Sequence, residues 1–268
     1  MNLLSRVLVS LVALPAVLLL VWLGDWWLFG LAAVAALVGL HEYTSMVRQL
    51  RPLVLACYVG ALLMLLGVTV GGLPWLLGGF LGSVLVAFVL HGVADTRQPP
   101  TVAIGSTVLG TAWVGFGLAH LVLLRDLPEY GLLAVYTVLI AVFAADTLAF
   151  FAGRLLGRHK LAPVMSPGKT WEGFLAGTLA AVAVAFFALY EDRDEFLLIW
   201  QALLLGAVVA LAAAIGDLFE SALKRDMQVK DTGRILGGHG GVLDRIDSLL
   251  FAAPAAYYLV LALGHGPA

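Results

Sequence analysis

Residues 221–247 read SALKRDMQVKDTGRILGGHGGVLDRID, a polar, glycine-bearing stretch near the C-terminal end of a very hydrophobic chain. Apolar runs lie on both sides of it, at 196–216 and 248–264. A run of about 20 apolar residues is the length that crosses a bilayer as a helix. The stretch therefore reads as a loop between two membrane-spanning helices, and its concentration of charge marks it as the place where chemistry is expected.

The rest of the chain has the composition of an integral membrane protein. Hydrophobic residues make up 62% of the 268 residues and charged residues only 12%, about half of the share usual in soluble domains. Seven further apolar runs precede residue 196, near 7–23, 26–40, 53–71, 73–90, 101–124, 131–150 and 172–190. Lipid offers no hydrogen-bond partner to an open strand edge, so these runs are expected to be helices.

We therefore predict an all-α, polytopic membrane protein of about nine transmembrane helices, forming a single membrane domain over residues 1–268. Residues 1–125 would supply packing and dimer-forming helices, and residues 126–268 the catalytic helices and loops. Threading the spans from a cytoplasmic N-terminus leaves only Arg125 and Arg193, of fifteen Lys and Arg, on the outer side. Cytoplasmic loops carry the excess of basic residues, so the connections 151–171 and 217–247 should face the cytoplasm of an inner membrane.

Four aspartates lie where the predicted helices meet that interface. Asp146 interrupts the run AVFAADTLAFFAG, Asp217 directly follows the eighth span, and Asp244 and Asp247 begin the ninth. An ionised carboxylate at such depth costs a few kcal/mol unless it is paired, hydrated or bound to metal. Acids beside Lys and Arg are typical of sites in which carboxylates hold Mg²⁺ and bases hold phosphates. The alternatives are pairing of Asp146 with Arg154 and a solvated, salt-bridged loop.

Two further features of the polar stretch bear on binding. If the eighth helix continues, Asp217, Glu220 and Lys224 share one face, because residues three and four apart lie above one another. The glycines on either side of His239 give a backbone that can approach a ligand closely and present its amides to an anion. A flexible turn would look similar, and a lone histidine has no specific chemical signature.

Other sequence motifs do not indicate a function, either because a required residue is missing or because helix packing explains them. In the basic connection GRLLGRHKLAPVMSPGKTWEG, where we expect a helix to begin at Ser166, the GKT imitates a P-loop, but Pro163 stands where that motif demands glycine. The pair His41 and Glu42 begins like a zinc-protease helix but lacks the second histidine. GxxxG spacings at 78–82 and 173–177 predict close helix contacts. Nucleic-acid binding receives no support from the composition.

The polar stretch resembles the signature of the phosphatidate cytidylyltransferase family, also called CDP-diacylglycerol synthases. The matching positions are Ser221, Lys224, Arg225, Lys230, Asp231, Gly233, His239, Gly240, Gly241, Asp244, Arg245 and Asp247. Upstream, the resemblance includes Asp146, Ser166 to Thr170 with Glu172 and Gly173, and Asp217, so it covers about the C-terminal half. Gly237 and Gly168 depart from the family, which often has proline and a basic residue there.

The resemblance implies transfer of a cytidylyl group from CTP to phosphatidic acid in phospholipid biosynthesis, and a homodimer among membrane lipids. It implies Mg²⁺ held by Asp217 and Asp244, with Asp146 and Asp247 completing the acidic set, and it allows a second cation. Lys224 and Arg225 are expected to act with these acids in catalysis. Substrate contacts are expected from Ser166, Lys169, Ser221, Lys230, His239, Gly240, Gly241 and Arg245.

Two rival classes fit parts of the pattern. A cation transporter could use Asp146, Asp217 and Asp244 as a permeation path, but such a path gains nothing from the adjacent Lys224 and Arg225. Another membrane enzyme that handles CTP or a lipid phosphate, such as a polyprenol kinase or an archaeal-type lipid cytidylyltransferase, has the same hydropathy. The complete signature favours phosphatidate as the acceptor.

Overall fold

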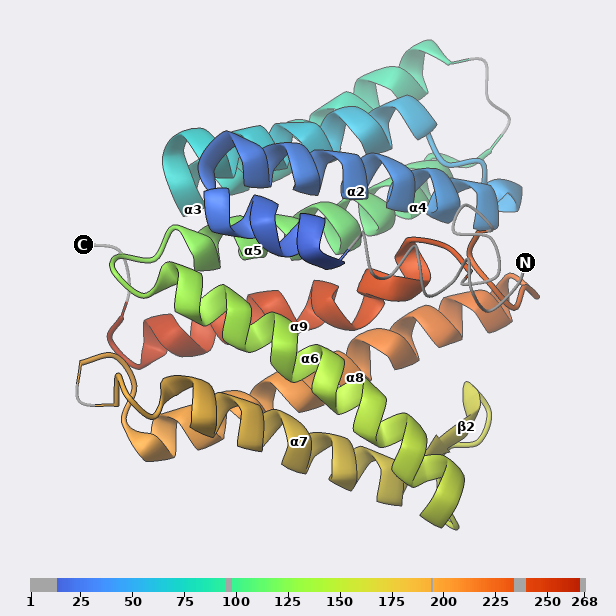
Figure 1. Ribbon diagram of the computed structural model, residues 1–268. Helices are drawn as coiled ribbons and strands as arrows, with labels where there is room; N and C mark the ends of the chain where they lie inside the picture. Colours follow the sequence, from blue (N-terminus) through green and yellow to red (C-terminus); the bar gives the residue numbers. More distant parts are fainter. Residues whose placement is uncertain (1–13, 95–97, 194, 234–239, 266–268) are drawn as a thin grey trace. The chain divides into compact units, whose positions relative to one another are not determined.

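The computed structural model describes residues 14–94, 98–193, 195–233 and 240–265, and its chain path is drawn in Figure 1. The helices are α2 (Asp25–Met46), α3 (Val54–Val93), α4 (Pro100–Gly110), α5 (Gly117–Arg125), α6 (Gly131–Leu156), α7 (Trp171–Leu189), α8 (Ile199–Asp226) and α9 (Leu243–Ala262), with the short helices η1 (Arg48–Leu50) and η2 (Thr111–Phe116). Two short strands, β1 (Lys160–Ala162) and β2 (Ser166–Thr170), form an antiparallel hairpin. The predicted all-α, polytopic fold is confirmed.

Among the described residues, seven helical segments are long and apolar enough to cross a membrane, with α4, η2 and α5 counted together as Pro100–Arg125. The predicted spans 53–71 and 73–90 both lie in α3, which bends where Gly71 and Gly72 leave the helical conformation. A shorter apolar helix, Leu14–Leu23, covers the described part of the first predicted span. The count of nine spans and the cytoplasmic N-terminus stay predictions.

The chain is organised as two compact units. The first contains Met1–Leu123 and Met227–Ile246, and the second contains Leu124–Asp226 and Asp247–Ala268. The last of the three boundaries falls inside α9, between Ile246 and Asp247. The polar stretch 221–247 is therefore divided: the end of α8 belongs to the second unit, whereas the loop that follows it belongs to the first.

Glycines allow the helices of the first unit to approach one another closely. A β-carbon at Gly79 would overlap the carbonyl group of Leu63, so the two arms of α3 touch at this point. Of the two glycines at the predicted 78–82 spacing, Gly82 also faces this arm, because a β-carbon there would lie 3.6 Å from Leu63 Cδ1. A β-carbon at Gly78 would meet no described atom within 4 Å, so Gly82 and the neighbouring Gly79 make the helix contact that the spacing predicts.

The second unit packs α6, α7 and α8 against one another through small residues. Gly173 and Gly177 of α7 lie so close to α6 that a β-carbon would overlap the carbonyl oxygens of Ala149 and Ala145. This confirms the close contact predicted from the 173–177 spacing. Gly206 of α8 approaches the backbone of α7 in the same way. Small residues at such crossings let backbones touch, which is how helices associate in lipid.

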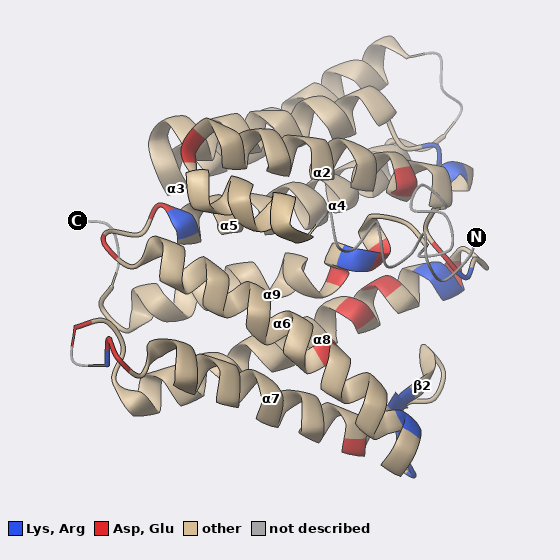
Figure 2. Cartoon of the chain, in the orientation of Figure 1, with Lys and Arg blue, Asp and Glu red and all other residues tan. Residues whose placement is uncertain are grey.

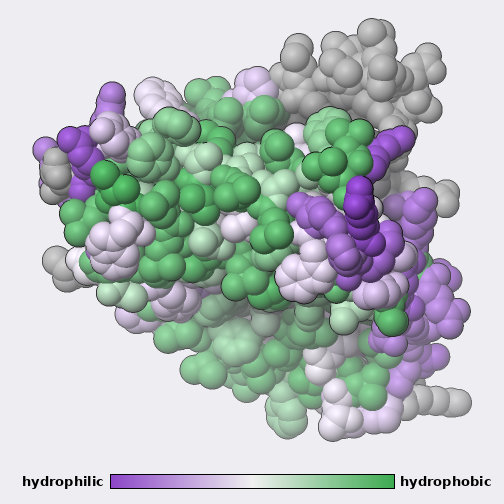
Figure 3. Space-filling model, turned by 90° about the horizontal axis from the view of Figure 1, so that it is seen from below, coloured by the Kyte–Doolittle hydropathy of each residue, from purple (hydrophilic) through white to green (hydrophobic). Residues whose placement is uncertain are grey.

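The surface is apolar along the helices and charged at their ends. In Figure 2 the helix middles are almost free of Lys, Arg, Asp and Glu, which gather near helix ends and in connections. The face shown in Figure 3 is mainly hydrophobic, with hydrophilic side chains at its margins. Large side chains stand exposed on α3 and α7, among them Leu81 at 68%, Phe88 at 66% and Phe187 at 75%. Such a surface suits contact with acyl chains.

Candidate active site

The C-terminal end of α8, which the sequence predicts to face the cytoplasm, changes from apolar to charged within three turns. Asp217, Glu220, Ser221 and Lys224 follow one another at helical spacing, as the sequence predicts, and Arg225 lies beside them. Glu220 is fully buried and Ser221 is 9% exposed, whereas Arg225 is exposed. The helix thus carries the carboxylate of Glu220 into the protein and leaves Arg225 toward the outside.

The buried carboxylate of Glu220 is paired with a lysine on its own helix. Lys224 Nζ lies 2.5 Å from Glu220 Oε2, one turn away, and the two side chains are 14% and 1% exposed. A buried charge is tolerated when it has an opposite charge and hydrogen bonds nearby. Lys224, predicted as a catalytic residue, is therefore placed beside a second carboxylate that the resemblance had not assigned.

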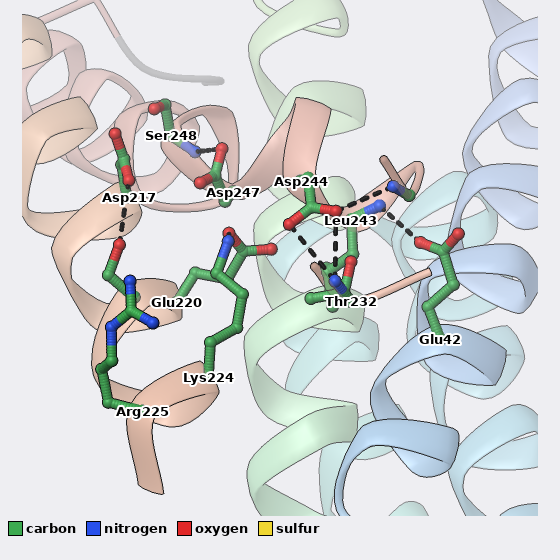
Figure 4. Close-up of polar contacts among 12 residues, drawn as sticks. Glu42, Asp217, Glu220, Lys224, Arg225, Thr232, Leu243, Asp244, Asp247 and Ser248 are labelled. Atoms are coloured by element: carbon green, nitrogen blue, oxygen red, sulfur yellow. Dashed lines mark hydrogen bonds and ion pairs between the residues drawn. The ribbon is translucent and has the colours of Figure 1, made fainter. Parts of the chain in front are cut away.

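Asp217 receives its cation from another element. Lys169 of β2 places Nζ 2.7 Å from Asp217 Oδ2, and the side chains are 22% and 35% exposed. Ser221 Oγ donates a long hydrogen bond of 3.4 Å to Asp217 Oδ1 (Figure 4). Two residues of the predicted site, far apart in the sequence, are thus brought into contact within the second unit.

Asp247 joins these acids at the start of the second-unit part of α9. Its carboxylate is 7% exposed, accepts the backbone N–H of Ser248 at 2.7 Å, and lies within electrostatic range of Glu220 and Asp217. The close approach depends on Gly216, because a β-carbon there would overlap the Asp247 carbonyl oxygen. We call Asp217, Glu220 and Asp247 the acidic cluster.

The hairpin that delivers Lys169 is fixed at both of its ends. Lys160 pairs with Thr170 across the strands, and Thr170 caps α7 by accepting the N–H of Gly173 at 3.2 Å. Arg225 Nε donates to the Met165 carbonyl at 3.3 Å. The expected helix start at Ser166 is wrong: Ser166 begins β2 and the helix begins at Trp171, because the strand pairing and the Thr170 cap delay it.

In the first unit, Asp244 holds the glycine loop, which we define by its described residues, 227–233 and 240–242. Its carboxylate accepts the N–H of Gly241 at 2.7 Å and that of Thr232 at 3.2 Å (Figure 4). Gly240 has φ +80°, a conformation that favours glycine. The predicted metal ligand Asp244 therefore also ties together two parts of the loop.

Glu42, which the sequence did not assign to the site, is hydrogen-bonded next to this loop. Glu42 of α2 is 2% exposed and accepts the backbone N–H of Leu243, the first residue of α9, at 2.8 Å. The contact joins positions 201 residues apart. The signal in the sequence was an acid two residues after the predicted span 26–40, in the pair His41 and Glu42 that begins like a zinc-protease helix.

The remaining predicted residues are placed less specifically. Asp146 is exposed on α6, Lys230 and Arg245 are exposed, and Ser166 is half-buried. His239 lies outside the described residues. Within the described ranges, no three His, Cys, Asp or Glu side chains form a group that could hold a metal ion by itself. A cation at the acidic cluster would therefore complete its shell with water or with oxygens of a substrate.

Comparisons with known proteins give one consistent result. The sequence profile of the cytidylyltransferase family matches residues 4–263. A phosphatidate cytidylyltransferase of Mycobacterium bovis is 33% identical over 279 aligned positions, which cover 94% of this chain and 86% of the relative. The M. tuberculosis H37Rv enzyme of that name is 33% identical over 94% of this chain and 80% of its own length. The Bacillus subtilis enzyme is 38% identical over 59% of this chain and 58% of its own length.

Proposed function

Because this chain belongs to the cytidylyltransferase family, we propose that it is a CTP:phosphatidate cytidylyltransferase, which makes CDP-diacylglycerol and pyrophosphate. The observation that carries the proposal is the alignment of enzymes of that name along 94% of the chain. The acidic cluster and its lysines supply the charge distribution that this reaction needs. Several long apolar helices place the protein in a membrane, where phosphatidate resides.

The reaction needs one new phosphorus–oxygen bond and one broken bond. A phosphate oxygen of phosphatidate attacks the α-phosphorus of CTP, and the bond from that phosphorus to the oxygen bridging to the β-phosphate breaks. Pyrophosphate leaves in line with the attacking oxygen. Such transfers depend mainly on positioning and on electrostatic stabilisation of the phosphates, so no covalent enzyme intermediate is required.

Lys169 can meet a phosphate while it contacts Asp217. An ammonium group has three N–H donors. Lys169 uses one toward Asp217, which leaves donors for phosphate oxygens, while Lys224 is paired with Glu220. Arg225, Lys230 and Arg245 are exposed and are the proposed outer contacts to the triphosphate or the lipid phosphate. We assign Ser166, Ser221, His239, Gly240 and Gly241 to substrate binding on the family signature.

The acidic cluster fits Mg²⁺ in its donor chemistry. Nucleotide enzymes hold Mg²⁺ with one or two carboxylates and complete its shell with water and substrate phosphates, so a three-ligand protein site is not required. The ammonium of Lys169, 2.7 Å from Asp217, already occupies a cation's place there. We assign Asp217 and Asp247 as ligands, while Asp146 and Asp244 remain predicted ones. When bound, the metal neutralises charge on the phosphates and the leaving pyrophosphate.

The same proposal covers location and partners. The bias of Lys and Arg toward one side of the predicted topology supports an inner-membrane enzyme whose site opens to the cytoplasm, where CTP is dissolved. Phosphatidate would arrive from the membrane leaflet. A homodimer is proposed on the family resemblance alone.

The test is an assay of the purified protein in detergent micelles with CTP, phosphatidic acid and Mg²⁺. We expect CDP-diacylglycerol and pyrophosphate in equal amounts. Release of CDP with a phosphorylated lipid would indicate a kinase instead, and activity only with an ether-linked isoprenoid phosphate would indicate an archaeal-type enzyme. Ion flux in vesicles without nucleotide, together with no product from folded protein, would support the transporter class.

A further inference from the structure

Glu42 is a buried acid that the proposed reaction does not use. It lies in α2, is 2% exposed, and belongs to the first unit together with the glycine loop. Burying a carboxylate costs free energy unless hydrogen bonds or charges compensate. Glu42 Oε2 has a hydrogen bond to the Leu243 N–H, whereas Oε1 has no partner among the described residues. Stability alone does not explain such a residue.

The hydrogen bond to Leu243 fixes the start of α9. The first N–H groups of a helix have no partner within it, and a negative charge near this end is favourable. Glu42, which lies on a different helix, supplies both the hydrogen-bond acceptor and the negative charge. Asp244, which accepts the N–H groups of Gly241 and Thr232, directly follows Leu243 in the chain. By fixing the Leu243 backbone, Glu42 therefore also fixes the backbone position of Asp244.

The loop also encloses the Glu42 carboxyl group on two sides. A β-carbon at Gly233 would overlap the Glu42 side chain, and one at Gly241 would overlap the Glu42 carboxylate and Thr232 Oγ1. Neither glycine has a positive φ. These two signature glycines are therefore required by the bulk of Glu42 rather than by an unusual backbone conformation (Figure 4 shows Glu42 beside Leu243 and Thr232).

We infer that Glu42 is a positioning residue of the transferase: it sets the glycine loop and the first turn of α9, and with them Asp244, for cytidylyl transfer. The inference rests on the proposed function for its kinetic part. Its structural part, the anchoring of the loop, stands on contacts within the first unit and is measured separately.

The first experiment compares three variants in purified, folded protein. Glu42→Met removes the acceptor for Leu243 while keeping the side-chain length, and we expect kcat per folded enzyme to fall about tenfold to a hundredfold, the range for a misplaced group. Glu42→Gln keeps an acceptor oxygen and should recover most of this loss. Asp25→Asn, which removes an exposed charge at the other end of α2, is the control and should leave kcat unchanged.

Hydrogen exchange separates positioning from general destabilisation. In Glu42→Met we expect faster exchange in peptides covering 231–233 and 240–245, with unchanged exchange in α7. Faster exchange everywhere, in proportion to a lower thermal midpoint, would mean that Glu42 is merely structural and would overturn the inference. This measurement needs no turnover. An inactive wild-type protein would therefore refute the proposed reaction, and hydrogen exchange would still test whether Glu42 anchors the loop.

A glycine substitution gives a sharper, pairwise test. Gly233→Ala should lower kcat and speed exchange at the loop, because its methyl group meets Glu42. In the double variant Gly233→Ala with Glu42→Ala, the methyl group enters the space that the glutamate left. We expect the double variant to be no worse than the poorer single one, since residues in contact are not additive. Simple multiplication of the two losses would show that Glu42 and Gly233 act independently.

Discussion

The acidic cluster and the glycine loop hold their carboxylates in different ways. In the cluster, Asp217 and Glu220 are paired with the ammonium groups of Lys169 and Lys224. In the loop, Asp244 accepts N–H groups from the backbone, as does Glu42. Both regions lie in the signature or contact it, and the first presents its acids to mobile cationic side chains.

This difference separates chemistry from architecture. A lysine can exchange its carboxylate for a phosphate or make room for a metal ion with little change in the backbone. A backbone N–H cannot leave its carboxylate unless the chain moves. Loss of charge in the cluster should therefore reduce turnover and leave the fold intact, whereas loss of charge in the loop should reduce both turnover and local stability.

The largest effect is expected for Asp217→Asn. The variant removes the charge that the proposed site offers to Mg²⁺, and losses of this electrostatic kind are about 100- to 1000-fold in kcat. The ion pair with Lys169 is partly exposed, so the free energy of unfolding should change by less than about 1 kcal/mol. Initial rates of CDP-diacylglycerol formation and thermal unfolding in detergent measure the two effects.

Asp226→Asn is the matched control for that variant. It makes the same change at an exposed carboxylate of the same helix, outside the acidic cluster. Turnover should stay within about threefold of wild type, because an exposed surface charge contributes little. Near-normal turnover in Asp217→Asn would remove Asp217 from the metal site and break the distinction between the two regions.

A smaller loss of turnover, accompanied by a loss of stability, is expected for Asp244→Asn. Asp244 Oδ2 accepts the N–H groups of both Gly241 and Thr232, and Oδ1 lies 3.4 Å from the Thr232 nitrogen, so an amide keeps one neutral acceptor, loses the charge and places a donor where the other oxygen was. Hydrogen bonds to a charged group contribute about 1.5–3 kcal/mol, more than those to a neutral one, so these contacts weaken. We expect turnover to fall about 100-fold, with faster hydrogen exchange confined to the loop. Unchanged exchange would show that Asp244 acts only in chemistry.

The helices were predictable from the sequence because lipid leaves the backbone few choices. Long apolar runs must form helices, and the seven candidate spans follow these runs. The hairpin was missed for a local reason. Pro167 after Ser166 is typical of a helix start, but the Thr170 side chain caps the helix four residues later and the preceding strand pairs with β1.

Within the site, sequence spacing predicted the contacts that lie along one helix and the resemblance predicted which acids matter. The spacing placed Glu220 and Lys224 on one face of α8, and they are paired. The bond between Glu42 and Leu243 could not be predicted, since it depends on tertiary contact across 201 positions. An acid two residues after the predicted span 26–40 was the available signal, and the sequence assigned it no partner and no role.

The smallest effect is expected for Lys169→Met. This variant tests directly whether the Lys169 side chain contacts the CTP phosphates. Methionine keeps the length of the side chain and removes its charge, so Asp217 stays while the proposed contact to the CTP phosphates is lost. We expect the KM for CTP to rise about tenfold, equivalent to about 1.4 kcal/mol, with a smaller change in kcat. Steady-state kinetics at varied CTP and fixed phosphatidate measure this change.

Lys160→Met is the control, because Lys160 lies on the partner strand of the same hairpin and is exposed. It removes the same charge from the same element without touching Asp217, so the KM for CTP should change by less than about twofold, and any change should vanish at higher salt. Equal effects of the two substitutions would mean that the hairpin attracts CTP only through its general charge. Lys169 would then be a structural partner of Asp217. The ion pairs of the acidic cluster would be as fixed as the hydrogen bonds from the backbone of the glycine loop to Asp244.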